Sequence, residues 1–112
     1  MTDDGAALIV RKLTEHFAPA DRDRAREVMG DIDLPRVQLA AIKLANGDVA
    51  TLERYALLAR IDWRDVIGPA ESPHYLAAGP SALDRPDADV IIERDRVEYE
   101  RWIESSGPYA GM

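Results

Sequence analysis

A chain of 112 residues, of which 46% are hydrophobic and 31% charged, has the size and balance of one soluble globular domain with a modest core. Its formal net charge is −7 and its arginines are interleaved with acids, so we expect no nucleic-acid surface and no binding to acidic membranes, which both need a dense positive patch. The chain has no cysteine, which excludes disulfides, thiolate zinc sites and cysteine nucleophiles.

Two helices are predicted in the N-terminal third. The first covers residues 3–17, where apolar side chains recur at steps of three and four residues, and Pro19 ends it. The second is short and runs from a cap at Asp21 to Met29. Neither a secretory leader nor a membrane-spanning stretch is evident, so we expect a cytoplasmic protein.

The third predicted helix begins with a cap at Asp33 and with Pro35 in its first turn, where a missing N–H costs nothing. Asn46 and Gly47 then supply a left-handed end. The segment "RVQLAAIKLA" between these signals is apolar on most sides. Such a helix is usually surrounded by others, so we expect it at the centre of the fold.

The best-defined predicted helix covers residues 49–67, with a cap at Asp48 before it and the Gly68-Pro69 break after it. At about 100° per residue, its apolar side chains form one continuous stripe. The members of this stripe are Val49, Leu52, Ala56, Ala59, Trp63 and Val66. We therefore expect Trp63 to point into the core.

A loop and a last helix are predicted for the C-terminal third. Residues 68–86 are rich in glycine, proline and serine, which indicates a loop with one helical turn around residues 74–78. Residues 87–104 are predicted as a helix, because the β-branched run at 90–92 has no second strand with which to pair.

These elements predict a single all-α domain over residues 1–104, a bundle of four to five helices, followed by a flexible tail at 105–112. The helices 49–67 and 87–104 are expected to pack on each other through three aromatic side chains, Trp63, Tyr99 and Trp102.

The segment "IKLANGDVATLERYALLARIDWRDVIGPAESPHY" resembles a family of short bacterial proteins that has no assigned activity. Members read roughly Lys-Leu-x-x-Gly-Asp, then a leucine-bearing helix, then Asp-Tyr/Trp-Arg-Asp-Val-Leu. Their C-terminal helix carries Asp-x-x-x-Tyr-x-x-Trp-Leu, which is similar here to Asp95, Tyr99, Trp102 and Ile103. The resemblance covers residues 40–103 and implies a helical fold in the bacterial cytoplasm, although Gly68-Pro69 departs from the continuing helix of the family.

A carboxylate cluster is the first candidate site. Asp62 and Asp65 lie three residues apart and share one face of the predicted helix. Together with Glu71 and His74 they could bind a divalent metal, because hard cations prefer oxygen ligands. The spacing matches no strict ligand motif, so we favour surface acids paired with arginines and predict no metal and no cofactor.

A small-molecule pocket lined by aromatic side chains is the second candidate. The aromatic residues are Tyr55, Trp63, Tyr75, Tyr99 and Trp102, with Arg64 and Asp95 as polar partners, although aromatics at helical spacing more often fill a core. Asp95 lies within the apolar face of the last helix, where a carboxylate needs a partner. We expect a tyrosine hydroxyl or an arginine from another helix, and the alternative is a functional acid with a raised pKa.

An interaction surface is the third candidate and the one that we favour. Leu57, Leu58 and Ile61 form an apolar patch, most of which lies off the buried stripe of helix 49–67. No phosphate loop, HExxH motif or nucleophile elbow occurs in the sequence. We therefore predict a non-catalytic domain that self-associates or docks onto a cytoplasmic protein, with a small metal-dependent enzyme or metal-binding module and a small-molecule binder as alternatives.

Overall fold

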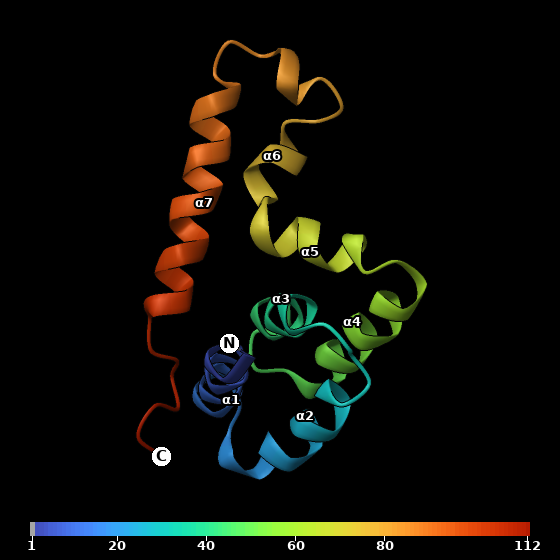
Figure 1. Ribbon diagram of the computed structural model, residues 1–112, viewed down its shortest axis with the longest axis vertical. Helices are drawn as coiled ribbons and strands as arrows, with labels where there is room; N and C mark the ends of the chain where they lie inside the picture. Colours follow the sequence, from blue (N-terminus) through green and yellow to red (C-terminus); the bar gives the residue numbers. More distant parts are fainter. Residues whose placement is uncertain (1) are drawn as a thin grey trace.

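Seven α-helices and two short 3-10 helices form the part of the chain that the computed structural model describes, which is the backbone of residues 2–112 and the side chains of 5–81 and 83–112 (Figure 1). In chain order they are α1 Thr2–His16, η1 Pro19–Asp21, α2 Arg22–Met29, α3 Pro35–Ala45, α4 Val49–Asp62, α5 Arg64–Glu71, α6 Pro73–Ala77, η2 Ala82–Asp84 and α7 Ala88–Glu104. This described part contains no strand, so the all-α class is confirmed. The α-helices are more numerous than the four to five that the sequence predicts.

The first three helices lie close to their predicted positions, but their caps differ. Asp21 precedes α2 without a hydrogen bond from its side chain to the helix. The residue at the cap position of α3 is Leu34, and the predicted cap at Asp33 is wrong, because Asp33 lies one residue before that position and no side-chain cap forms. Asn46 ends α3 in the left-handed conformation, with φ 49°, as predicted.

Helix α3 lies at the centre of the fold and packs against α1, α4 and α5 (Figure 1). Its alanines let the neighbouring helices approach closely, and its larger apolar side chains fill the remaining space. The buried residues of α3 are Val37, Leu39, Ala40, Ala41, Ile42 and Ala45. The prediction of a central helix is confirmed.

The predicted helix 49–67 is wrong in its extent, because two helices occupy this segment. Helix α4 ends at Asp62, Trp63 forms the junction, and α5 begins at Arg64. The Asp62 carboxylate accepts a hydrogen bond from the Arg64 N–H at 3.1 Å. This local bond competes with the helical pattern and favours a turn at this point.

Pro69 does not end the helix that contains it. Helix α5 continues through Gly68-Pro69 to Glu71, so residues 68–71 are helical and not part of the predicted loop. A proline inside a helix removes one N–H donor and crowds the preceding turn. Here it lies in the last turn of a short helix, where that cost is small.

Helices α6 and α7 form the upper part of the view in Figure 1, with α7 along the longest dimension of a molecule of 46 × 30 × 28 Å. Helix α6 confirms the predicted helical turn, and α7 confirms the predicted last helix. Helix α7 packs against α6, α5 and η2. The predicted contact through Trp63 is wrong, since Trp63 lies in a surface groove, whereas Tyr99 and Trp102 pack against the core.

The hydrophobic core lies among α1 to α5 and contains Leu13, Phe17, Val28, Met29, Ile42, Leu52, Val66 and Ile67. At about 25 cal/mol per Å² of buried apolar surface, these side chains are the main source of stability. Within residues 2–112, no helix combines the length and the apolarity needed to cross a membrane.

Residues 105–112 run back toward α1 and α2 (Figure 1). The Tyr109 N–H donates to the Glu15 carbonyl oxygen at 2.8 Å, and the Arg22 guanidinium donates to the Met112 carbonyl oxygen at 2.9 Å. The flexibility of this tail stays a prediction, and any motion has to break these bonds.

Candidate functional site

The predicted interaction patch is divided by the fold. Leu57 and Ile61 are 59% and 83% exposed, so both are free to contact another molecule. Leu58 instead packs against the hydrophobic core. The difference follows from helix geometry, because Leu57 and Ile61 are four residues apart and share the outer side of α4.

Trp63 joins these exposed residues, contrary to the prediction that it points into the core. Its side chain is 44% exposed. The chain turns at Trp63, and the buried positions that follow are taken by Val66, Ile67 and Ala70 of α5. The Arg64 guanidinium carbon lies 5.9 Å from the centroid of the indole ring. A partly exposed tryptophan is typical of protein-binding surfaces.

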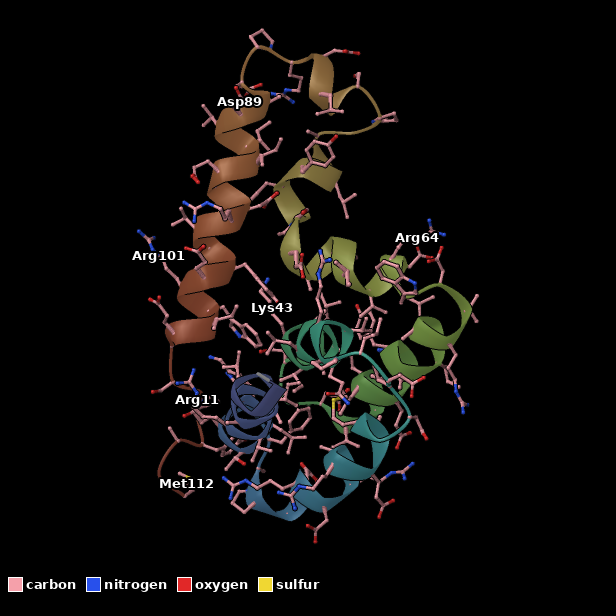
Figure 2. The ribbon with its side chains drawn as sticks, in the orientation of Figure 1. Arg11, Lys43, Arg64, Asp89, Arg101 and Met112 are labelled. Carbon is pink, nitrogen blue, oxygen red and sulfur yellow. The ribbon has the colours of Figure 1, made fainter. Side chains whose placement is uncertain are left out.

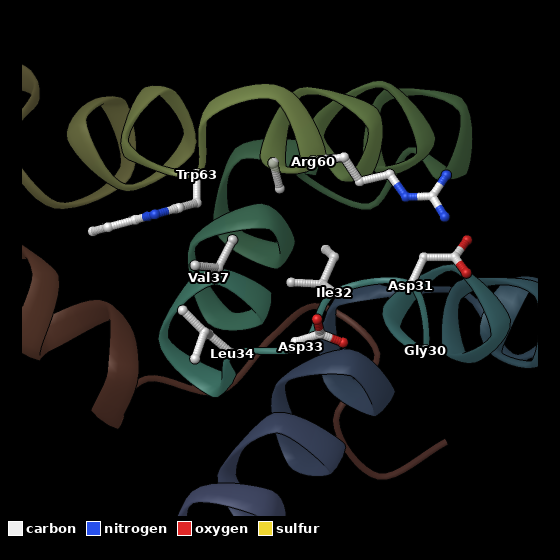
Figure 3. A pocket seen from close by; sticks show the side chains of 9 residues that line it. Gly30, Asp31, Ile32, Asp33, Leu34, Val37, Arg60 and Trp63 are labelled. Atoms are coloured by element: carbon white, nitrogen blue, oxygen red, sulfur yellow. The ribbon is translucent and has the colours of Figure 1, made fainter.

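A groove of about 510 Å³ lies beside Trp63. We call it the Trp63 groove, and its lining includes Asp31, Ile32, Leu34, Val37, Arg60 and Trp63. In Figure 3 the indole lies above Val37 and Leu34 at one end, and Arg60 extends toward Asp31 at the other end. Leu34 is itself 52% exposed. The groove therefore has an apolar end and a charged end.

A smaller recess of about 190 Å³ adjoins this groove along α4. We call it the Leu57 pocket, and its lining includes Arg24, Val28, Asp31, Glu53, Leu57 and Arg60. The two recesses share Asp31 and Arg60 in their linings, so they adjoin each other, and together we call them the depression. It lies between α4 on one side and α2 with the start of α3 on the other.

The charges around this depression differ in how they are paired. Arg24 bridges Glu27 and Glu53, at 3.0 and 2.8 Å. Asp31, Asp33 and Arg60 have no ion pair within the described residues, although Arg60 extends toward Asp31 (Figure 3). The groove thus presents two carboxylates and one guanidinium that are available to a bound molecule.

Three of the four candidate metal ligands each pair with a different residue. The Asp62 carboxylate pairs with Arg64 at 3.1 Å, Glu71 binds Arg36 through two bonds of 2.7 and 2.9 Å, and His74 lies 2.8 Å from Glu98. Asp65 is exposed. The side chain of Arg64 holds the pKa of Asp62 below its usual range. No group of three metal-ligating side chains occurs in the described part of the chain, and the geometry does not favour the metal alternative.

Asp95 is buried, and its partners are backbone groups. Its two carboxylate oxygens accept hydrogen bonds from the N–H groups of His74 and Tyr75, both at 3.0 Å. These donors belong to the first turn of α6, where helical N–H groups have no partner within the helix. The prediction of a tyrosine hydroxyl or an arginine as the partner is wrong. Asp95 instead links α6 to α7 through these two hydrogen bonds.

The candidate aromatic residues do not form one pocket. Tyr75 and Tyr99 line a groove of about 460 Å³ between α6 and α7, together with Leu83, Ile92 and Asp95. Trp63 lines the groove already described. Burial raises the pKa of Tyr99, whose hydroxyl finds no hydrogen-bond partner among the described residues.

Trp102 is covered by other side chains. The ring of Tyr99 stacks on it at 5.8 Å between centroids, and the ring of His16 lies 5.4 Å away. The Lys12 ammonium lies 4.6 Å from the centroid of the indole ring. The space beside Trp102 is thus filled by protein, which does not favour a ligand pocket there.

Sequence reasoning missed one buried lysine, Lys12, and one half-buried lysine, Lys43. Lys12 is fully buried, and Lys43 extends from α3 toward α7 (Figure 2) and donates to the Ala70 carbonyl oxygen at 2.8 Å. Burial lowers the pKa of both ammonium groups. A signal for Lys12 exists in the sequence, because it lies three residues after Ile9 and beside the apolar face of α1.

Comparisons with protein-family models, with curated proteins and with solved structures found no match to this chain. The resemblance to a bacterial family stays a prediction.

Proposed function

We propose that the chain is a non-catalytic interaction domain that docks onto another protein, which we expect to be cytoplasmic, through the Trp63 groove and the Leu57 pocket. The observation that carries this proposal is the exposure of Trp63 and Leu34 in the Trp63 groove and of Leu57 in the adjoining Leu57 pocket, with Ile61 exposed on the same helix one turn after Leu57. Large apolar side chains gathered on a surface mark binding sites more often than scattered ones do. Tryptophan is also enriched among residues that dominate binding energy.

Docking onto a different protein is favoured over self-association. The chain carries a net charge of −7, so two copies repel each other. Asp31 and Asp33 lie at the depression without ion pairs to the described side chains, and a second copy would bring its own carboxylates to the same place. Like charges that face each other across an interface weaken it.

Site-specific photo-crosslinking tests this proposal. A benzophenone amino acid is placed at Leu57 or at Ile61, and the chain is irradiated in an extract of the cells that express it. Matched controls carry the same group at Leu83 or at Val90, which are 70% and 69% exposed on the distant α6–α7 part. We expect an adduct from positions 57 and 61 that is absent from positions 83 and 90.

Two variants separate binding from folding. Trp63→Ser removes the indole from the groove, and Ile61→Ser changes a side chain that is 83% exposed and supports little of the fold. Both are expected to reduce the adduct formed from position 57, with circular dichroism spectra that match the wild type. Equal adducts from all four positions would contradict the proposal, and an adduct between two copies would replace docking with self-association.

A further inference from the structure

We infer that the partner presents a basic amphipathic helix to this depression, with apolar side chains at its two ends and lysine or arginine between them. This inference rests on the proposed function and names the chemistry of the partner. It follows from three properties of the depression: the spacing of its two recesses, the shape of its apolar end and the sign of its unpaired charges.

The spacing of the two recesses matches one face of a helix. Leu57 and Trp63 are six residues apart along a backbone that is helical up to Asp62 and keeps helical angles at Trp63, with φ −61° and ψ −24°. At 1.5 Å per residue, the two positions are roughly 9 Å apart along α4. A partner helix that lies along α4 presents its residues i and i+7 about 10 Å apart. One helix can therefore fill both recesses with two side chains of the same face.

The apolar end of the groove fits a large side chain. Trp63 lies above Val37 and Leu34 (Figure 3), and these three residues leave an open slot between helix α3 and the α4–α5 junction. A leucine or an aromatic side chain placed there is covered on two sides by apolar groups. Burying such a side chain contributes about 1.5–3 kcal/mol, which makes it the anchor of the complex.

The unpaired charges select a basic partner. Asp31 is shared by both recesses and Asp33 lines the Trp63 groove, and neither carboxylate has an ion pair within the described residues. The described lining of the Trp63 groove holds two carboxylates, Asp31 and Asp33, and one guanidinium, Arg60, so its net charge is negative. A lysine or arginine between the two anchors meets Asp31 and Asp33, and the net charge of −7 attracts a basic chain from a distance.

A pair of designed peptides tests this inference on the full chain. Both are helical, with leucines at positions i, i+4 and i+7, and one carries lysines where the other carries glutamates. Each is labelled with fluorescein, and its binding is measured by fluorescence anisotropy. We expect the lysine peptide to bind at least about tenfold more tightly than the glutamate peptide, and higher salt to reduce this difference.

Matched charge variants show which carboxylates cause the preference for the lysine peptide. The double variant D31N/D33N removes two carboxylates from the groove, and D84N/D89N removes the same charge from exposed positions near α7. We expect D31N/D33N to reduce the affinity for the lysine peptide about tenfold. We expect D84N/D89N to change this affinity less than about twofold. Equal binding of both peptides, or equal loss in both double variants, would overturn the inference.

Failure of the inference is distinguishable from failure of the proposed function. If the crosslinked partner meets positions 57 and 61 with an acidic or non-helical segment, the docking function stands and the basic helix is wrong. If no adduct forms at these positions and neither peptide binds, both are wrong. A lysine peptide that binds Trp63→Ser as tightly as the wild type would also overturn the inference, because binding would then occur elsewhere.

Discussion

The ammonium group of Lys12 lies against the indole of Trp102, 4.6 Å from the ring centroid, and donates hydrogen bonds to the carbonyl oxygens of Trp102 and Ser105. These oxygens belong to the end of α7, where helical carbonyls have no partner within the helix. A cation at this end is also favoured by the helix dipole. One buried side chain of α1 thus holds the C-terminal end of α7 in place.

Replacing Lys12 by methionine tests this contact between α1 and the C-terminal end of α7. The variant Lys12→Met keeps the apolar stem but removes the ammonium donor from both carbonyl oxygens, of which only that of Trp102 also accepts from the Ser105 N–H and hydroxyl. We therefore expect a loss of about 1–3 kcal/mol in the free energy of unfolding. The measurement is urea denaturation followed by circular dichroism. Arg11→Met is the control, because Arg11 is exposed, donates to Ile103 near the same helix end, and can be replaced there by water. Equal losses of unfolding free energy in the two variants would show that the burial of Lys12 does not increase its contribution to stability.

The carboxylate of Asp95 is expected to be essential for the position of α6. Asp95→Ala leaves the N–H groups of His74 and Tyr75 unpaired beside a buried position, which costs about 1–3 kcal/mol of stability. Asp95→Asn keeps one acceptor oxygen and is expected to lose less. Asp89→Ala, at an exposed acid on the same helix, is the control and should stay within about 0.5 kcal/mol. Amide exchange of residues 73–77 follows the release of α6, and unchanged exchange in Asp95→Ala would contradict this role.

Gly107 is the position where the tail tolerates no side chain. A Cβ atom at this position would lie 2.3 Å from the Glu15 carbonyl oxygen, which is too close for any contact. Gly107→Ala must therefore move the tail away from α1, and we expect loss of the Tyr109–Glu15 hydrogen bond together with faster proteolysis after residue 105. Gly5→Ala is the control and should leave the tail unchanged, because an added Cβ there meets no described atom within 4 Å beyond its own helix backbone and chain neighbours. Identical proteolysis of the two variants would show that the tail is already free.

We expect the stability of the folded protein to decrease as the pH falls, because of His16. Burial lowers the pKa of His16 from its ordinary 6.5, and the charge of Lys12 lowers it further, while Glu15 opposes the shift. The folded protein therefore binds this proton less readily than the unfolded chain does. The resulting stability is complete above pH 6.5 and is lost as the pH falls toward the lowered pKa.

Urea denaturation at about pH 7.5 and about pH 5.5 measures this dependence, since most carboxylates keep their charge in that window. His16→Gln removes the titrating group and is expected to flatten the dependence. The NMR chemical shift of the His16 ring, followed through the same pH range, reports the pKa directly. A midpoint at or above 6.5 would contradict the expected direction.

The sequence by itself determined most of the helices, because their signals are local. Periodic apolar residues predict α1 to α3 and α7, and the Asp48 side chain accepts the Thr51 N–H at 3.2 Å, as its position before α4 predicts. The apolar surroundings of α3 also follow from its composition, since a helix without a polar face has to be covered on most sides. These inferences need only residues that lie within a few turns of one another.

The tertiary structure alone decided which side chains meet and which remain outside. Asp95 and Tyr75 are 20 residues apart, and Lys12 and Ser105 are 93 apart, so no local pattern reports either contact. Trp63 continues an apolar stripe only if one straight helix runs through it, and the turn after Asp62 places it at the surface. The candidate binding surface depends on that turn, because periodicity identifies the apolar face of a helix but not which neighbour covers it.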